Sequence, residues 1–316
     1  MKSPEVYLLA PDKNVLSQFI VIKTKNDKIV VIDGGHELYE PCLAPAIRAI
    51  LGLSDGDYFE IDGWFLSHPH NDHYGEATKL LSQMQSGAEF KVKNFYFDYP
   101  DLYNCTFSPS DYSIESYNAL KSAFCNYATK TGEKDPENYF DSLNGKIINQ
   151  GSVKNGLTIT IDGVDFDILQ TRSNEDEQVN SCSMVIRARF LVDGIEKKIL
   201  FLNDVSKNSG NRLLERYGNE LKSDAVQISH HGQAGADKNV YDAINAKFRL
   251  WPTTNWVWTD EKTFRTGETR SWFNITVNGS DNDLVSCAYK DYPQDRTKAD
   301  DWKKCIAQMK LSMDKL

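Results

Sequence analysis

The chain has 316 residues, of which 40% are hydrophobic and 26% are charged, so it can bury a core and global disorder is excluded. Its formal net charge of −9 argues against a general electrostatic grip on nucleic acid, which requires a basic face. No apolar run approaches the ~20 residues that a membrane helix needs, so we expect no membrane segment.

The amino terminus and the cysteines give an expectation about the compartment. The first residues, MKSPEVYLLAPDKN, hold too short an apolar core for a signal peptide, which favours a cytoplasmic protein, with secretion after signal removal as the alternative. The cysteines form no CxxC pair, so a cysteine-built zinc site is not expected, and most should be reduced. They are Cys42, Cys105, Cys125, Cys182, Cys287 and Cys305.

The first half of the sequence is typical of short strands joined by turns and helices, because β-branched runs are separated by Pro, Gly, Asn and Asp. Strands are predicted at 6–10, 19–24, 28–35, 61–67 and 93–100. Helices are predicted at 41–52, 75–85 and 114–132. The strand at 61–67 leads directly into His68.

The second half continues this mixture. An Asp-Gly pair predicts a hairpin over 182–205, and a strand over 224–232 ends in two histidines. A helix is expected at 296–314. No linker divides the chain, so residues 1–316 are expected to form a single domain, with a C-terminal extension from about residue 251. Strands that end in acidic or imidazole residues in both halves predict an α/β sandwich with its chemistry at one edge.

The stretch SHPHNDH, residues 67–73, holds four candidate metal ligands: His68, His70, Asp72 and His73. His68 and His70 are two residues apart, so in extended backbone their side chains point the same way. Imidazole and carboxylate groups are the ligands that zinc prefers, with manganese and iron as further candidates. The pattern therefore indicates a metal site, and the alternative is a solvated histidine-rich turn.

The pattern His-x-His-x-Asp-His resembles the signature of the metallo-β-lactamase superfamily. Other segments follow in that family's order: VVIDGG (30–35), ILFLNDV (199–205) and VQISHHG (226–232). The resemblance spans roughly residues 5–235 and implies a four-layer αββα sandwich. The HHG ending is similar to one branch, the hydrolase domains of bacterial DNA-uptake channels and the phosphorylcholine esterases of teichoic acids.

Two positions depart from the family's pattern. Glu76 stands where the family often has the second glycine of Asp-His-x-Gly-Gly. The chain also lacks the histidine that many members carry before the strand of the bridging aspartate. The matching segment, EQVNSCSMVIR, offers Asn180 or Ser181 there, as in the DNA-uptake branch.

The resemblance implies two metal ions held by unequal sets of ligands. One set is His68, His70 and Asp204, with a weak oxygen donor from Asn180. The other set is Asp72, His73, Asp204 and His230. Because the second set supplies more protein ligands, we expect it to bind its ion more tightly.

Three further residues receive roles. Neighbouring side chains at a strand end point to opposite faces, so only one of His230 and His231 should bind the metal, and we favour His230. His231 is then left to contact substrate or donate a proton, and together with Asp72 it forms the expected catalytic pair. Asp33 is interpreted as a turn residue or as a partner that orients a ligand imidazole, with direct metal contact as the alternative.

These patterns predict a metal-dependent hydrolase with two divalent ions, zinc favoured and manganese or iron as alternatives, in which a metal-bound hydroxide attacks the substrate. The absent histidine and the HHG ending favour a phosphodiester or other phosphate ester, small or polymeric. Nucleic acid stays an alternative substrate that the acidic charge disfavours. A lactone or thioester hydrolase of the same superfamily and a metal-binding protein without turnover are the competing hypotheses.

Overall fold

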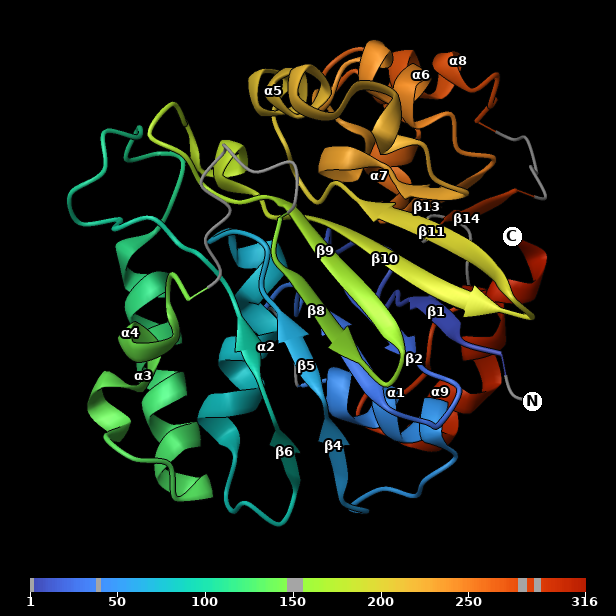
Figure 1. The fold of residues 1–316 in the computed structure, drawn as a ribbon. Helices are drawn as coiled ribbons and strands as arrows, with labels where there is room; N and C mark the ends of the chain where they lie inside the picture. Colours follow the sequence, from blue (N-terminus) through green and yellow to red (C-terminus); the bar gives the residue numbers. More distant parts are fainter. Residues whose placement is uncertain (1–2, 38–40, 147–155, 278–282, 287–290) are drawn as a thin grey trace.

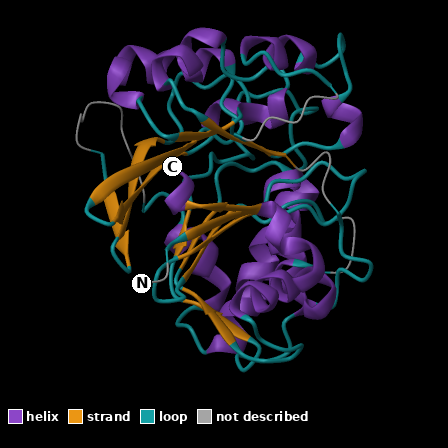
Figure 2. Cartoon of the chain, turned by 90° about the vertical axis from the view of Figure 1, so that its right-hand side faces the viewer, coloured by secondary structure: helices purple, strands orange, loops and turns teal. Residues whose placement is uncertain are grey.

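The computed structural model describes residues 3–37, 41–146, 156–277, 283–286 and 291–316. Two β-sheets pack face to face, and helices cover the outer face of each (Figure 1). Figure 2, turned by 90°, shows the four layers in the order helix, sheet, sheet, helix. The predicted α/β fold of the αββα type is confirmed.

The first sheet has six strands in the order β15, β1, β2, β3, β5 and β7. Their bounds are Lys310–Ser312, Glu5–Leu8, Ile20–Lys23, Ile29–Ile32, Gly63–Phe65 and Phe95–Tyr96. Strands β3, β5 and β7 are parallel, so their carboxyl ends reach the same edge. A separate parallel pair consists of β4, Phe59–Ile61, and β6, Phe90–Val92.

The second sheet has seven strands in the order β14, β13, β12, β11, β10, β9 and β8. Their bounds are Leu284–Ser286, Phe248–Trp251, Ala225–Gln227, Ile195–Phe201, Val185–Val192, Val164–Gln170 and Thr158–Ile161. The predicted hairpin is β10–β11, and it turns at Asp193 and Gly194, whose φ angles are 49° and 82°. Strands β11, β12 and β13 are parallel and end at one edge.

The helices divide between the two outer faces. In Figure 1, α1, α2, α3 and α9 lie on the side of the first sheet, and α5, α6 and α8 cover the second. The bounds of α1 to α5 are Leu43–Leu51, Asn71–Gln83, Ile114–Thr131, Tyr139–Leu143 and Lys207–Tyr217. The bounds of α6 to α9 are Lys238–Ile244, Asn255–Trp258, Thr266–Trp272 and Ala299–Cys305.

Strand β11 shows how the sequence builds this sandwich. Its last three residues, which are buried, alternate between two apolar cores, as the two-residue period of a strand requires. Ile199 and Phe201 belong to the core shared with the first sheet, whereas Leu200 belongs to the core that contains Leu213 of α5 and Val240 of α6. This end of the strand is therefore held between two apolar layers.

The C-terminal segment differs from the prediction. The helix predicted at 296–314 spans only Ala299–Cys305, and the chain then forms β15, which pairs with β1. Strand β14 likewise pairs with β13 at the edge of the second sheet. Residues beyond 251 thus add an edge strand to each sheet, and the division into one domain with a C-terminal extension stays a prediction.

Two further expectations concern the cysteines and the membrane. Every cysteine in the described part of the chain is free, while Cys287 lies outside the described residues. Among the residues that the structure describes, no helix combines the length and the apolar character needed to cross a bilayer.

Candidate metal centre

The predicted ligands follow strands that end at one edge of the sandwich. Strand β5 leads into His68, β11 ends three residues before Asp204, and β12 ends shortly before His230 and His231. Strand β3 ends immediately before Asp33. Because the carboxyl ends of parallel strands converge, segments far apart in the sequence meet at this edge.

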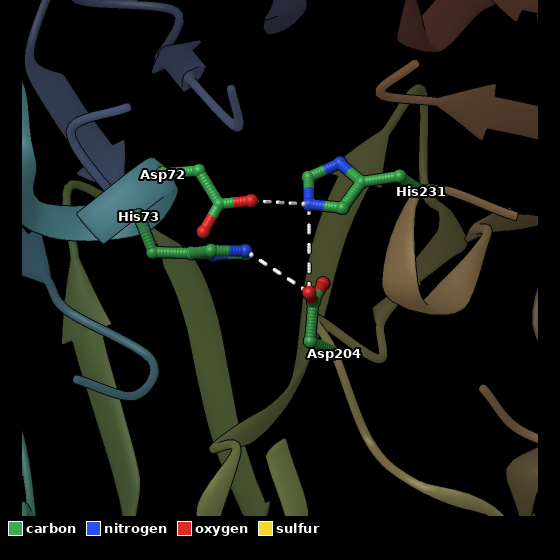
Figure 3. Close-up of side chains that lie close together, drawn as sticks. All are labelled: Asp72, His73, Asp204 and His231. Carbon is green, nitrogen blue, oxygen red and sulfur yellow. Dashed lines mark ion pairs between the residues drawn. The ribbon is translucent and has the colours of Figure 1, made fainter. Parts of the chain in front are cut away.

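Four side chains form one cluster: Asp72, His73, Asp204 and His231 (Figure 3). One ligand atom from each lies within 4.8 Å of the others. Nε2 of His231 is 3.1 Å from Oδ2 of Asp72 and 3.4 Å from Oδ2 of Asp204. Nε2 of His73 is 3.2 Å from the same Asp204 oxygen. Two members come from each half of the chain, so the site forms only when the two sheets pack together.

Asp72 and His73 lie in the first turn of α2, which begins at Asn71 and not at residue 75 as predicted. His70 directly precedes the helix with extended backbone, at φ −104° and ψ 145°. The early start places Asp72 at the positive end of the helix dipole, which favours a carboxylate there. This first turn was not predicted from the sequence, because its polar ligand residues do not show the apolar periodicity of a helix.

The chain after β12 turns instead of continuing as a strand. His230, His231 and Gly232 have φ angles of 51°, 56° and 85°, so the alternation that favoured His230 does not apply. His231 is fully buried in the cluster, whereas Nε2 of His230 lies 3.2 Å from Nδ2 of Asn180. A Cβ on Gly232 would lie 2.2 Å from Nε1 of Trp251, so this turn requires glycine. The geometry favours His231 over His230 as the ligand.

Hydrogen bonds on the outer nitrogens orient both imidazoles of the cluster. Nδ1–H of His73 donates to Oδ2 of Asp33 at 2.6 Å. Nδ1–H of His231 donates to the carbonyl oxygen of Pro252, also at 2.6 Å. A carboxylate and a carbonyl can only accept, so Nδ1 of each ring carries a proton and Nε2 is the nitrogen that faces the cluster.

Asp33 is itself fixed from several directions. It is fully buried, and it accepts hydrogen bonds from the backbone and hydroxyl of Ser67 at 2.7 and 2.9 Å. Nε2 of Gln18 donates to it at 2.8 Å. Asp33 lies outside the four-residue cluster and contacts it through His73, which favours the interpretation of this residue as an orienting partner.

His68 and His70 present a second pair of donor nitrogens beside the cluster. Nε2–H of His70 donates to the carbonyl of Asp111 at 2.8 Å, and Nδ1 of His68 lies 2.9 Å from the hydroxyl of Ser67. The remaining nitrogens, Nε2 of His68 and Nδ1 of His70, face each other at 3.2 Å. The ring of His68 is 4.2 Å from that of His73, so the pair adjoins the cluster.

These donors fit divalent metal ions. Nε2 of His73, Nε2 of His231 and Oδ1 of Asp204 are buried without a hydrogen-bond partner, a state that folded proteins rarely tolerate. Burial alone would lower the pKa of His231, but the charges of Asp204 and Asp72 raise it to about 9. The cluster therefore attracts a cation, and its imidazole and carboxylate donors suit zinc, manganese or iron.

The position of the absent histidine falls on a short 3₁₀ turn, Val179–Cys182. The hydroxyl of Ser181 is bonded to that of Ser206 at 2.8 Å. Asn180, by contrast, keeps its Oδ1 buried without a hydrogen-bond partner. Of Asn180 and Ser181, Asn180 is therefore the residue whose side-chain oxygen is better placed to bind a metal ion.

Three contacts of the site were not found from the sequence. Gln18, Ser67 and Asp111 hold Asp33, His68 and His70. Of these three residues, only Ser67 could have been suggested by the sequence, because it directly precedes His68. Gln18 and Asp111 lie in loops, and nothing in their local pattern indicates a role.

Comparison with known proteins gives a partial match. Residues 14–84 match the family model described as the metallo-beta-lactamase superfamily, a segment that includes β2, β3, β5 and α2. No curated protein sequence matches the chain. The matched segment carries His68, His70, Asp72 and His73, so the family model covers the histidine-rich part of the site.

Several solved structures are similar at low identity. The diiron β-hydroxylase CmlA from Streptomyces venezuelae is 11% identical, with 80% of this chain and 46% of that chain covered and a TM-score of 0.41. A long form RNase Z from yeast is 11% identical, with coverages of 79% and 37% and a TM-score of 0.38. A metal-dependent hydrolase of the β-lactamase superfamily is 9% identical, with coverages of 90% and 96% and a TM-score of 0.43. The chain spans less than half the length of the first two.

Proposed function

We propose that this protein is a hydrolase of phosphate esters, with phosphodiesters as the preferred class, that uses two divalent metal ions. The observation that carries the proposal is the buried cluster of Asp72, His73, Asp204 and His231, whose inward-facing nitrogens lack hydrogen-bond partners. A second pair of donor nitrogens beside it supports two ions rather than one.

The geometry supports two sets of ligands. Asp72, His73, Asp204 and His231 would hold one ion. His68 and His70 would hold the other, with Asp204 shared and Oδ1 of Asn180 as a weak donor. When bound, such ions act as Lewis acids and lower the pKa of water toward neutrality. Zinc is the favoured metal, with manganese or iron as alternatives, because the donors are imidazole and carboxylate.

The remaining residues hold or contact the reacting groups. Asp33 and the carbonyl of Pro252 keep the imidazoles of His73 and His231 in one tautomer. His230 is not part of the cluster, so we assign to it the role first given to its neighbour, which is to contact the substrate or donate a proton. The exchange of roles follows from the left-handed turn that carries both histidines.

The substrate class is supported by what replaces the absent histidine. An amide oxygen at Asn180 is a weaker and harder donor than an imidazole, which disfavours the β-lactam chemistry that normally uses a histidine there. The resemblance of HHG to branches that cleave phosphate esters agrees with this. Nucleic acid belongs to the same chemical class, but the net charge of −9 disfavours a long anionic substrate.

Turnover of three substrates by the purified, metal-loaded protein tests the proposal. The substrates are bis-p-nitrophenyl phosphate, a lactone and the β-lactam nitrocefin. Hydrolysis of the diester alone is the expected result. Hydrolysis of the lactone alone would assign the protein to another class of the superfamily, and bound metal without any turnover would indicate a binding protein. Anomalous scattering at the metal absorption edges identifies the element and its ligands together.

A further inference from the structure

A buried glutamine connects the two halves of the metal centre. Gln18 lies in the loop before β2 and is fully buried. Its Nε2 donates to Oδ2 of Asp33 at 2.8 Å and to Oδ1 of Asn203 at 2.6 Å. Asp33 follows a strand of the first sheet and Asn203 a strand of the second, so one carboxamide spans the two sheets.

Both hydrogen-bond partners of the Gln18 side chain, Asp33 and Asn203, are directly connected to a residue of the cluster. On the first sheet, Asp33 accepts the Nδ1 proton of His73. On the second, Asn203 immediately precedes Asp204 in the chain. The backbone N–H of Gln18 adds a third contact, because it donates to the carbonyl oxygen of Asp72 at 3.0 Å.

The side chain and backbone of Asn203 are held by several hydrogen bonds. Its φ of 51° is left-handed, a conformation that asparagine adopts more readily than most other residues apart from glycine. Its side chain donates to the carbonyl of Met184, and its carbonyl accepts from the backbone of His230 at 3.0 Å. The bond from Gln18 is the second hydrogen bond of the Asn203 side chain. Asp204 therefore follows a residue whose side chain and backbone are both held in place.

The bonding of Gln18 is not that of a residue that merely fills the core. Its own Oε1 is buried without a hydrogen-bond partner, so an apolar side chain of the same size would avoid an unsatisfied group. The two donated bonds are what this glutamine provides.

We propose that Gln18 is a positioning residue that sets the spacing of His73 and Asp204, and through it the affinity and coordination geometry of the metal centre. Their facing atoms, Nε2 and Oδ2, are 3.2 Å apart. The inference rests on the proposed metal centre, which it extends from the ligands to the link between the sheets.

The test compares Gln18→Met with the wild type. The variant keeps the length of the side chain and removes both donated bonds. We expect the dissociation constant for Zn²⁺, measured by competition with a chromogenic chelator, to rise about 10–100-fold. The absorption spectrum of the Co²⁺ form should also change, because ligand geometry changes. A purely structural role would lower the melting temperature of the metal-free protein and leave this spectrum unchanged.

The matched control is Gln170→Met, which makes the same chemical change at another buried glutamine, whose Nε2 has no hydrogen-bond partner. It should keep the wild-type Zn²⁺ affinity and Co²⁺ spectrum. If Gln18→Met does not fold, Gln18→Glu serves, since it places an acceptor where a donor is needed and should weaken Zn²⁺ at least as much. Wild-type affinity and spectrum in a folded Gln18 variant would overturn the inference. A wild-type protein that binds no Zn²⁺ or Co²⁺ would overturn the proposed function instead.

Discussion

His73 donates its Nδ1 proton to Asp33 across 2.6 Å, and neither side chain is exposed. The bond fixes the ring so that Nε2 faces Asp204. A carboxylate on the far side of an imidazole also strengthens its remaining nitrogen as a metal ligand. This pair therefore couples the turn after β3 to the centre of the cluster.

Asp33→Asn is expected to weaken Zn²⁺ binding about 10–100-fold. The amide can present only one acceptor, so its NH₂ group must face a donor of Ser67 or His73. Isothermal titration measures the affinity. Asp62→Asn is the matched control, because Asp62 is a buried carboxylate that accepts from the backbone of Ile29 and does not contact the cluster. Equal affinity in both variants would exclude an orienting role for Asp33.

The two neighbouring histidines should separate metal binding from turnover. His231→Gln removes a cluster nitrogen, so the protein should lose its most tightly held ion. His230→Gln should keep its metal content and lose diester turnover by about 10²–10⁴-fold, the usual range for a residue that transfers a proton. Elemental analysis after dialysis measures the metal. Loss of metal in His230→Gln with retention in His231→Gln would restore the assignment made from the sequence.

The sequence predicted the fold, and it supplied candidate residues for the site, because its signals were dense. The apolar runs that became β3, β5 and the end of β11 are short and buried, and each leads to a polar residue of the site. The spacing of His68, His70, Asp72 and His73 needed no tertiary information. The hairpin at Asp193 and Gly194 was equally local.

The differences between prediction and structure came from backbone geometry that only tertiary contacts fix. Nothing in HHG reveals the left-handed turn, which is set by the packing of Gly232 against Trp251 and brings His231 into the cluster. The first turn of α2 was missed because ligand residues replace the apolar stripe. The strand β15 was missed because its pairing partner, β1, lies at the other end of the chain.

Chelation should remove the two ions in order. The ion at His68 and His70 is expected to leave first, because that set has fewer protein ligands than the cluster of Asp72, His73, Asp204 and His231. Crystals soaked in limiting chelator and measured at the metal absorption edge show which site empties. In His70→Ala, the first step of metal loss, from the site of His68 and His70, should disappear. The second step, from the four-residue cluster, should remain. Early loss from the four-residue cluster would contradict the assigned order.

Glu76 is a buried residue of α2 whose carboxyl group contacts the start of α1. It accepts hydrogen bonds from the backbone N–H of Cys42 and of Leu43, the latter at 2.8 Å. Burial outweighs these bonds and raises the pKa of Glu76 to about 7. The folded protein therefore prefers the protonated form more strongly than the unfolded chain does.

Because the pKa of Glu76 is higher in the folded protein than in the unfolded chain, the free energy of unfolding should fall as the pH rises. The contribution of Glu76 is fully present below its unfolded pKa, near 4.5, and is lost as the pH rises through about 7. Glu76→Gln should therefore gain stability over the wild type by roughly 2–3 kcal/mol between pH 5 and pH 8. Urea unfolding of the metal-free protein at both pH values measures the difference.

The control is Glu115→Gln, which makes the same chemical change at an exposed glutamate of α3. The metal-free form is required because metal binding to imidazoles changes with pH on its own. If Glu76→Gln instead loses stability relative to the wild type as the pH rises, the carboxylate is ionised in the folded protein. Its bonds to the N-terminus of α1 would then outweigh the cost of burying its charge.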